Sequence, residues 1–172
     1  MLKEKVTIES GLTYGDWLER IARLEKVKDL TGEKILYARS KNLMKLRHFK
    51  KANSAEARIP LTEDFKKFQK EVNALRNKYV ITGPQGPIID IQNPSYIADL
   101  QALQEKFKDA IEERERDSEA YNDFLMEVVR AEDEIEVHTS INDATKELTQ
   151  EQVDAIWWFV EERKEEANTP SE

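Results

Sequence analysis

The stretch that decides the predicted fold is Asn93-Pro94-Ser95-Tyr96-Ile97, which opens a helical pattern extending to Arg130. Asn93 can accept hydrogen bonds from the amides of a first helical turn, and Pro94 suits the first helical position, where no amide hydrogen is needed. Apolar residues then recur at helical spacing: Ile97, Leu100, Leu103, Phe107, Ile111, Tyr121, Phe124, Leu125, Val128 and Val129. We therefore predict one long helix, or two helices end to end, as the spine against which the other helices pack.

Length and composition indicate a globular protein with a charged surface. The 172 residues suit one domain, and 36% are charged, with a net charge of -8 that opposes non-specific binding to nucleic acid or anionic membrane. The absence of cysteine excludes disulfides, thiolate metal sites and a cysteine nucleophile. Neither the start of the chain nor its longest apolar run, 155–160, resembles a signal peptide or a membrane span. We expect a single domain over residues 1–163, a disordered acidic tail over 164–172, and a cytoplasmic location.

The first half of the chain predicts a short strand and three helices. Residues 4–9 alternate loosely, as in a strand. Thr13 can cap a helix that residues 29–32 end, and a second helix is expected over about 33–55. Thr62 can cap a third helix, whose apolar stripe is Phe65, Phe68, Val72, Leu75 and Tyr79.

A β-hairpin is predicted around Gly83-Pro84-Gln85-Gly86-Pro87, because β-rich runs flank this turn at 79–82 and 88–91. Pro84 and Pro87 lack the amide that a strand ladder requires, so we expect the loop to project rather than pair. A loop stiffened in this way can insert into a partner, although most such turns only connect. Residues 135–139 alternate and are predicted to add a third strand to this hairpin.

The last helix begins with the capping box Thr149-Gln150-Glu151-Gln152. Its predicted buried stripe is Val153, Ile156, Trp157 and Val160. Trp158 and Phe159 lie partly outside that stripe, so they either cover a neighbouring helix or form a partner-binding patch. The fold class expected from all these elements is α+β and mostly α: a helical bundle around one long helix, with a small antiparallel hairpin or three-stranded sheet.

The sequence contains no catalytic or cofactor signature, and we predict no cofactor and no metal. His48 and His138 have no partner at the spacing of a metal site, and no Glu is followed by His three residues later. A carboxylate cluster does lie on the spine: Glu112, Glu113, Glu115, Asp117 and Glu119. Such a run is typically a solvated face, so we predict that the protein is not an enzyme, with a paired-carboxylate hydrolase as the enzymatic alternative.

Charge is segregated along the chain. Residues 39–51 hold six basic side chains and no acid, whereas residues 105–136 hold thirteen acids and five basic side chains. We favour pairing of the two blocks with each other, either within the fold or between copies. Alternatively, the acidic block forms a separate face that mimics nucleic acid, or the basic helix binds phosphates.

The order of these elements carries a resemblance. A basic block at 41–46 leads to the Tyr-Val-Ile hairpin, and a helix begins at Pro94-Ser95-Tyr96-Ile97. An acidic segment at 135–137 and the capped helix at 148–159 then follow. Over about residues 30–162, this arrangement resembles small uncharacterised helical proteins encoded among the late or structural genes of tailed bacteriophages. The resemblance implies a phage origin and a non-enzymatic role.

We therefore predict a protein-interaction module: a phage accessory or assembly protein, or an inhibitor that binds a host protein, in the host cytoplasm or the virion. The predicted contacts are Pro84, Gln85, Trp158 and Phe159, with Arg47 and Lys50 steering the partner electrostatically. We expect a homo-oligomer and no membrane partner. The alternative is a nucleic-acid-binding protein that uses the basic helix 39–51.

Overall fold

The computed structural model describes residues 5–8, 11–133 and 135–161, and the chain divides into two compact units. Unit 1 comprises the described residues of Met1–Ser54 and Phe124–Glu172, and unit 2 comprises Ala55–Asp123. The predicted fold class is confirmed, because the chain is mostly helical with two small β-sheets. The sequence predicted one domain over 1–163, whereas the structure has two units; the tail predicted at 164–172 lies outside the described residues.

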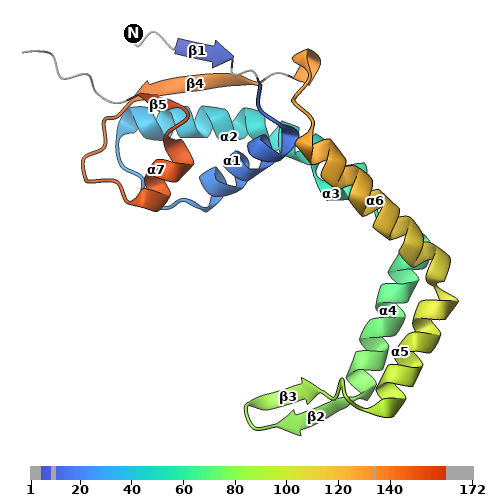
Figure 1. The fold of residues 1–172 in the computed structure, drawn as a ribbon. Helices are drawn as coiled ribbons and strands as arrows, with labels where there is room; N and C mark the ends of the chain where they lie inside the picture. Colours follow the sequence, from blue (N-terminus) through green and yellow to red (C-terminus); the bar gives the residue numbers. More distant parts are fainter. Residues whose placement is uncertain (1–4, 9–10, 134, 162–172) are drawn as a thin grey trace, which may run out of the picture. The chain divides into compact units, whose positions relative to one another are not determined.

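Unit 1 packs three helices against a small mixed sheet. Its elements are β1 (Lys5–Ile8), α1 (Tyr14–Lys26), α2 (Glu33–Asn53), a 3-10 turn η1 (Ala131–Asp133), β4 (Glu136–Ile141), α7 (Gln150–Ile156) and β5 (Val160–Glu161). The strand order is β1-β4-β5, with β1 antiparallel and β5 parallel to β4. Helices α1, α2 and α7 lie together on one side of this sheet (Figure 1).

The strand predicted at 135–139 exists, but its predicted partner was wrong. As β4, it pairs with β1 and β5 instead of extending the 79–91 hairpin, which remains two-stranded. The physical reason is burial. Val137 of β4 is only 1% exposed and belongs to the core of unit 1, so the strand is held where its apolar side chain has partners.

The main core is built around α1 rather than around the 93–130 segment. Trp17, Ile21 and Leu24 follow each other at intervals of four and three, and each is at most 1% exposed. They pack with buried residues of the other elements: Ile35, Ala38, Leu43, Leu46, Val137, Ala155, Ile156, Trp158 and Phe159. Thr13 begins α1 with a capping box to Asp16, so the predicted cap is confirmed.

Helix α2 receives its cap from a residue far along the chain. The Asp143 carboxylate accepts hydrogen bonds from the amides of Lys34 at 2.8 Å and Ile35 at 3.2 Å. Gly32 has a φ of 97°, and a Cβ atom there would clash with the side chain and backbone of Asp143. Glycine is therefore required for this turn and for the close approach of the carboxylate.

Asn42 on α2 continues the hydrogen-bonded edge of β4 beyond the end of β5. Its Nδ2 atom donates to the His138 carbonyl at 3.0 Å, and its Oδ1 atom accepts from the His138 amide at 2.8 Å. On the same edge, the Ser140 amide donates to the Phe159 carbonyl at 2.8 Å. A side-chain amide offers one acceptor and one donor group, so Asn42 substitutes for one residue of a neighbouring strand.

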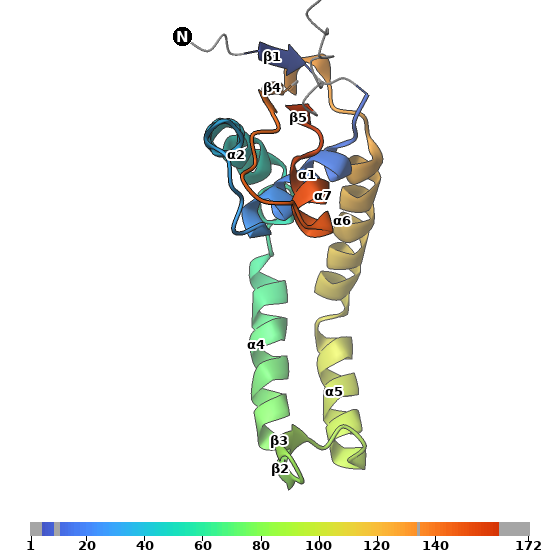
Figure 2. The same ribbon diagram turned by 90° about the vertical axis from the view of Figure 1, so that its left-hand side faces the viewer.

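Unit 2 is a helical hairpin with a β-hairpin between its helices. It contains α3 (Ala55–Arg58), α4 (Glu63–Lys78), β2 (Val80–Gly83), β3 (Gly86–Ile89), α5 (Pro94–Lys106) and all but the end of α6 (Lys108–Met126). Helices α4 and α5 run side by side in opposite directions, and the β-hairpin joins them at one end (Figure 2).

Local sequence signals in unit 2 are largely confirmed. The Thr62 hydroxyl accepts from the Phe65 amide, and the Asn93 side chain accepts from the Ser95 amide, so both predicted caps form. The predicted spine is two helices rather than one. The break lies at Phe107, and α6 is continuous across residues 114–118.

Candidate functional site

Unit 2 displays large aliphatic side chains instead of burying them. Its buried apolar residues are only Leu75, Tyr96 and Ala110. Five large aliphatic residues within 80–97 are exposed: Val80 44%, Ile81 45%, Ile88 49%, Ile91 64% and Ile97 44%. Exposed apolar patches are typical of interaction sites, so this segment is the candidate site. We call residues 80–91 the apolar hairpin.

The turn of the apolar hairpin consists of Pro84 and Gln85 alone. Thr82 pairs with Pro87, and Gly83 pairs with Gly86, so both strands extend up to the turn. The prediction that the whole loop projects without pairing was therefore wrong. Pro87 is tolerated in β3 because its register position directs the missing amide away from β2. Pro84 and Gln85, which the sequence predicted as contacts, are exposed at the tip.

The two faces of the hairpin are both aliphatic. Ile81 pairs with Ile88, and Val80 pairs with Ile89. Since directly paired residues of an antiparallel ladder point to the same face, each pair lies on one face of the hairpin. Residues 79–89 contain no Asp, Glu, Lys or Arg, although 36% of the chain is charged. The hairpin is therefore aliphatic on both faces and uncharged from Tyr79 to Ile89.

The base of the hairpin is anchored to both α4 and α5. The Tyr79 hydroxyl donates to the Asp99 carboxylate at 2.8 Å, and the Lys78 ammonium donates to it at 3.0 Å. The Tyr79 ring also meets the Tyr96 ring edge-on, with centroids 5.5 Å apart. The hydrogen bonds from Lys78 and then from Tyr79 hold the pKa of the Asp99 carboxyl below its usual value. These contacts fix the start of β2 relative to α5.

The C-terminal aromatic residues are placed differently from the predicted surface patch. Trp158 is 5% exposed and Phe159 is 1% exposed, so both belong to the core, as the alternative interpretation of these rings expected. Trp157 was predicted to be buried, but it is 60% exposed, and Val153 is 37% exposed. The Trp157 amide donates to the Val153 carbonyl at 2.9 Å, so these two residues still follow helical spacing. They lie on the exposed face of α7, whereas Ala155 and Ile156 are buried.

The exposed Trp157 ring is held by a cation. The Arg20 guanidinium carbon lies 5.1 Å from the Trp157 ring centroid, 5.2 Å from that of Trp17 and 5.4 Å from that of Trp158. Each such contact at a surface is worth about 0.5–1 kcal/mol. Arg20 therefore joins all three tryptophans of the chain into one structural cluster within unit 1.

The basic helix is partly neutralised within unit 1. Lys45 forms an ion pair with Glu136 at 2.6 Å, and Lys50 forms one with Glu25 at 2.7 Å. The hydrogen bond from Lys45 lowers the pKa of the Glu136 carboxyl, and Glu136 belongs to the acidic block 105–136. Of the two residues predicted to steer a partner, Lys50 is thus ion-paired, whereas Arg47 is exposed.

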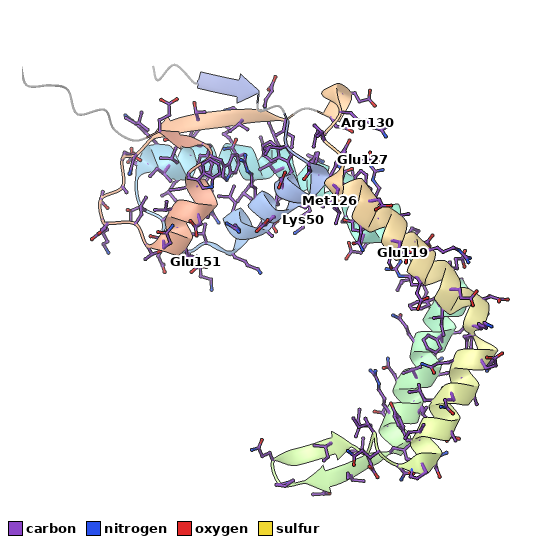
Figure 3. All side chains as sticks on the ribbon, in the orientation of Figure 1. Lys50, Glu119, Met126, Glu127, Arg130 and Glu151 are labelled. Carbon is purple, nitrogen blue, oxygen red and sulfur yellow. The ribbon has the colours of Figure 1, made fainter. Side chains whose placement is uncertain are left out.

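The acidic residues of α6 form a solvated face. Glu112, Glu113, Glu115 and Glu119 are exposed, and Glu119 projects from α6 in Figure 3. Within the described ranges, no three acidic or histidine side chains are placed to hold a metal ion.

A groove of about 910 Å³ lies in unit 1 between the start of α2 and β4. Its described lining combines Tyr37, Leu36 and Ile141 with polar residues such as Asp143 and Glu161. The Asp143 carboxylate already caps α2 and is not directed to a ligand. Because this carboxylate is already engaged within the fold, we rank the groove below the apolar hairpin as a candidate site.

Comparison with known proteins supplies no function for this chain. No protein family model, no curated protein and no solved structure matches it. Across the part of the chain that the structure describes, no helix is long and apolar enough to cross a membrane. The apolar hairpin is thus the strongest candidate site in the described residues. Sequence reasoning found its turn but missed its aliphatic faces, although the uncharged run 79–89 was a signal that could have identified them.

Proposed function

We propose that the protein is a non-enzymatic protein-interaction module whose unit 2 presents the apolar hairpin to a protein partner. The observation that carries this proposal is the uncharged run 79–89, with Ile81 45% exposed and Ile88 49% exposed on the same face. Burying aliphatic surface of this kind against an uncharged partner surface stabilises the complex by about 25 cal/mol per Å² removed from water.

The chemistry of the hairpin favours protein over nucleic acid. Recognition of nucleic acid depends on Lys and Arg side chains that neutralise phosphates, and residues 79–89 contain neither. The anchoring of Tyr79 to Asp99 and Tyr96 supports a preformed binding element, because it limits the ordering that a partner has to impose. On this proposal, unit 1 supplies a stable core and unit 2 supplies the contact.

Capture experiments with matched variants test the proposal. Ile88→Lys places a charge on the aliphatic face, while Leu36→Lys changes a similarly exposed residue of α2 (44% against 49%). We expect Ile88→Lys to reduce capture of a host or virion protein by about tenfold or more, since a central contact is lost and a charge is buried, and Leu36→Lys to leave it unchanged. Equal capture by both variants would contradict the proposal. The predicted phage origin would make the partner a virion protein or a host factor, and the neighbouring genes test that origin.

Nucleic-acid binding through residues 39–51 is the alternative. It is less well supported, because Lys45 and Lys50 are engaged by Glu136 and Glu25. It predicts a DNA or RNA affinity that falls steeply with salt and is lost when Arg47→Glu is combined with Lys50→Glu. The absence of a mobility shift at low salt would remove this alternative.

A further inference from the structure

We propose that the outer edge of β2 pairs with β2 of a second copy of this chain, joining two apolar hairpins into one four-stranded antiparallel sheet. This inference rests on the proposed function, because it names one partner of the same surface. It is carried by the direction of the backbone groups on the two hairpin edges.

The outer edge of β2 carries backbone groups that face away from β3. Gly83 and Gly86 close the ladder, and the Asp90 amide donates to the Tyr79 carbonyl at 2.9 Å. In an antiparallel ladder, pairs that exchange hydrogen bonds alternate with pairs that do not. The N–H and C=O groups of Val80 and Thr82 therefore point outward. Among the described residues, no backbone group outside the hairpin forms a hydrogen bond with these N–H and C=O groups.

The outer edge of β3 is blocked. Pro87 has no amide hydrogen, and the Ile89 carbonyl already accepts from the Ile91 amide at 2.9 Å. Edge strands that lack donors in this way resist pairing with another chain. The hairpin thus has one edge that can add a strand and one that cannot. Pairing through β2 consequently closes at two copies and does not propagate into a fibre.

The pattern of the open edge is self-complementary. With a two-fold axis at Ile81, Val80 of each copy lies opposite Thr82 of the other, and each of these two residue pairs exchanges two N–H···O bonds. Ile81 then lies opposite Ile81 of the second copy. Since Ile81 and Ile88 share a face in each hairpin, pairing produces one continuous row of isoleucines across the four strands.

The hairpin strands carry no charge that would oppose this pairing, and the small area of the contact limits its affinity. Each chain carries a net charge of -8, but residues 79–89 are uncharged, so the paired strands place no like charges opposite each other. Strand β2 has only four residues, and a standard stable interface buries about 800 Å² per partner. We therefore expect a weak dimer that depends on concentration rather than a permanent one.

Sedimentation equilibrium and amide exchange of the full chain test the proposal. We expect the dimer fraction to rise with concentration, and the Val80 and Thr82 amides to gain protection while the Ile81 amide, bonded within the hairpin, changes little. Ile81→Lys and Ile81→Glu should each weaken the dimer by about tenfold or more, because like charges then lie opposite each other. Mixing these two variants should restore dimerisation.

Substitutions at Ile88 provide the matched control. In the proposed register, Ile88 lies on the outer strand of each hairpin, so a mixture of Ile88→Lys and Ile88→Glu should show no gain over either variant alone. A monomer at all concentrations, or no recovery from the mixed Ile81 variants, would overturn the pairing. If the chain is monomeric but Ile88→Lys still abolishes partner capture, the proposed function stands and only this inference fails. If neither readout responds to the hairpin, both fail.

Discussion

In unit 1 the large apolar side chains point into a shared core, whereas in unit 2 they gather on an exposed hairpin. Every buried residue of the main core cluster belongs to unit 1. Unit 1 also exposes apolar residues, but they are scattered over several elements, while those of unit 2 all fall within residues 80–97. The two units thus place similar residues differently: buried in a core in unit 1 and exposed in unit 2.

Unit 2 holds its helices together with few buried residues. Unit 2 relies on ring contacts and ion pairs along α4 and α5, such as Phe68 against Phe107 at 5.7 Å and Lys106 with Glu71 at 2.8 Å. Exposed ion pairs contribute little, typically about 0–1 kcal/mol each. The few buried residues of unit 2 should therefore matter greatly to it.

The largest expected effect is at Phe159, a core residue of unit 1 that lies close in sequence to the exposed Trp157. Phe159→Ala should lower the free energy of unfolding by about 3–5 kcal/mol, since it empties a fully buried site. Trp157→Ala, next to it in sequence but 60% exposed, should cost only about 1 kcal/mol through loss of the Arg20 contact. Chemical denaturation followed by circular dichroism measures both. Equal losses of unfolding free energy in the two variants would contradict the assignment of Phe159 to the core and Trp157 to the surface.

Leu75 tests whether unit 2 depends on a small core. Leu75 is 8% exposed, and Leu75→Ala should cost about 2–3 kcal/mol, seen as faster hydrogen exchange along α4 and α5. Ile91→Ala, at a 64% exposed site, should change stability by no more than about 0.5 kcal/mol. Unchanged exchange in Leu75→Ala would show that unit 2 is held by other contacts.

Asn42 tests the bond between helix and sheet in unit 1. Asn42→Leu keeps the side-chain volume but removes the partners of the His138 amide and carbonyl. The free energy of unfolding should therefore fall by about 1–3 kcal/mol. The local readout is exchange of the His138 amide, which should accelerate more than that of Ser140, whose partner is Phe159. Unaltered protection of His138 would mean that the side chain is not its partner.

The smallest effect is the titration of Asp99 at the base of the hairpin. Its pKa is lowered in the folded chain, so its contacts contribute stability above the unfolded pKa, and this contribution is lost as pH falls through the folded value. Tyr79→Phe removes one donor and should raise the Asp99 pKa toward the usual 3.8. Carboxyl NMR titration measures this shift, and an unmoved pKa would leave Lys78 as the sole cause.

Local signals predicted the elements well, but periodicity alone did not show which face of α7 is buried. The caps at Thr13, Thr62 and Thr149 and the hairpin turn all form, because each depends on residues within a few positions. The stripe drawn through Val153 and Trp157 was wrong at both residues, because that face of α7 is exposed while Ala155 and Ile156 are buried. The candidate site was found only in part, since Pro84 and Gln85 were named but the isoleucine faces beside them were not.

The sequence by itself determined the fold class, the caps, the break before α2 and the hairpin, since these depend on spacing and on side chains adjacent along the chain. Only the tertiary structure decided that β4 pairs with β1 and β5, that Asp143 caps α2, and that Trp158 and Phe159 are buried. The Asp143 bond joins residues 109 positions apart. Partnerships of this range depend on which apolar surfaces close on each other, and that is a property of the whole chain rather than of any local pattern.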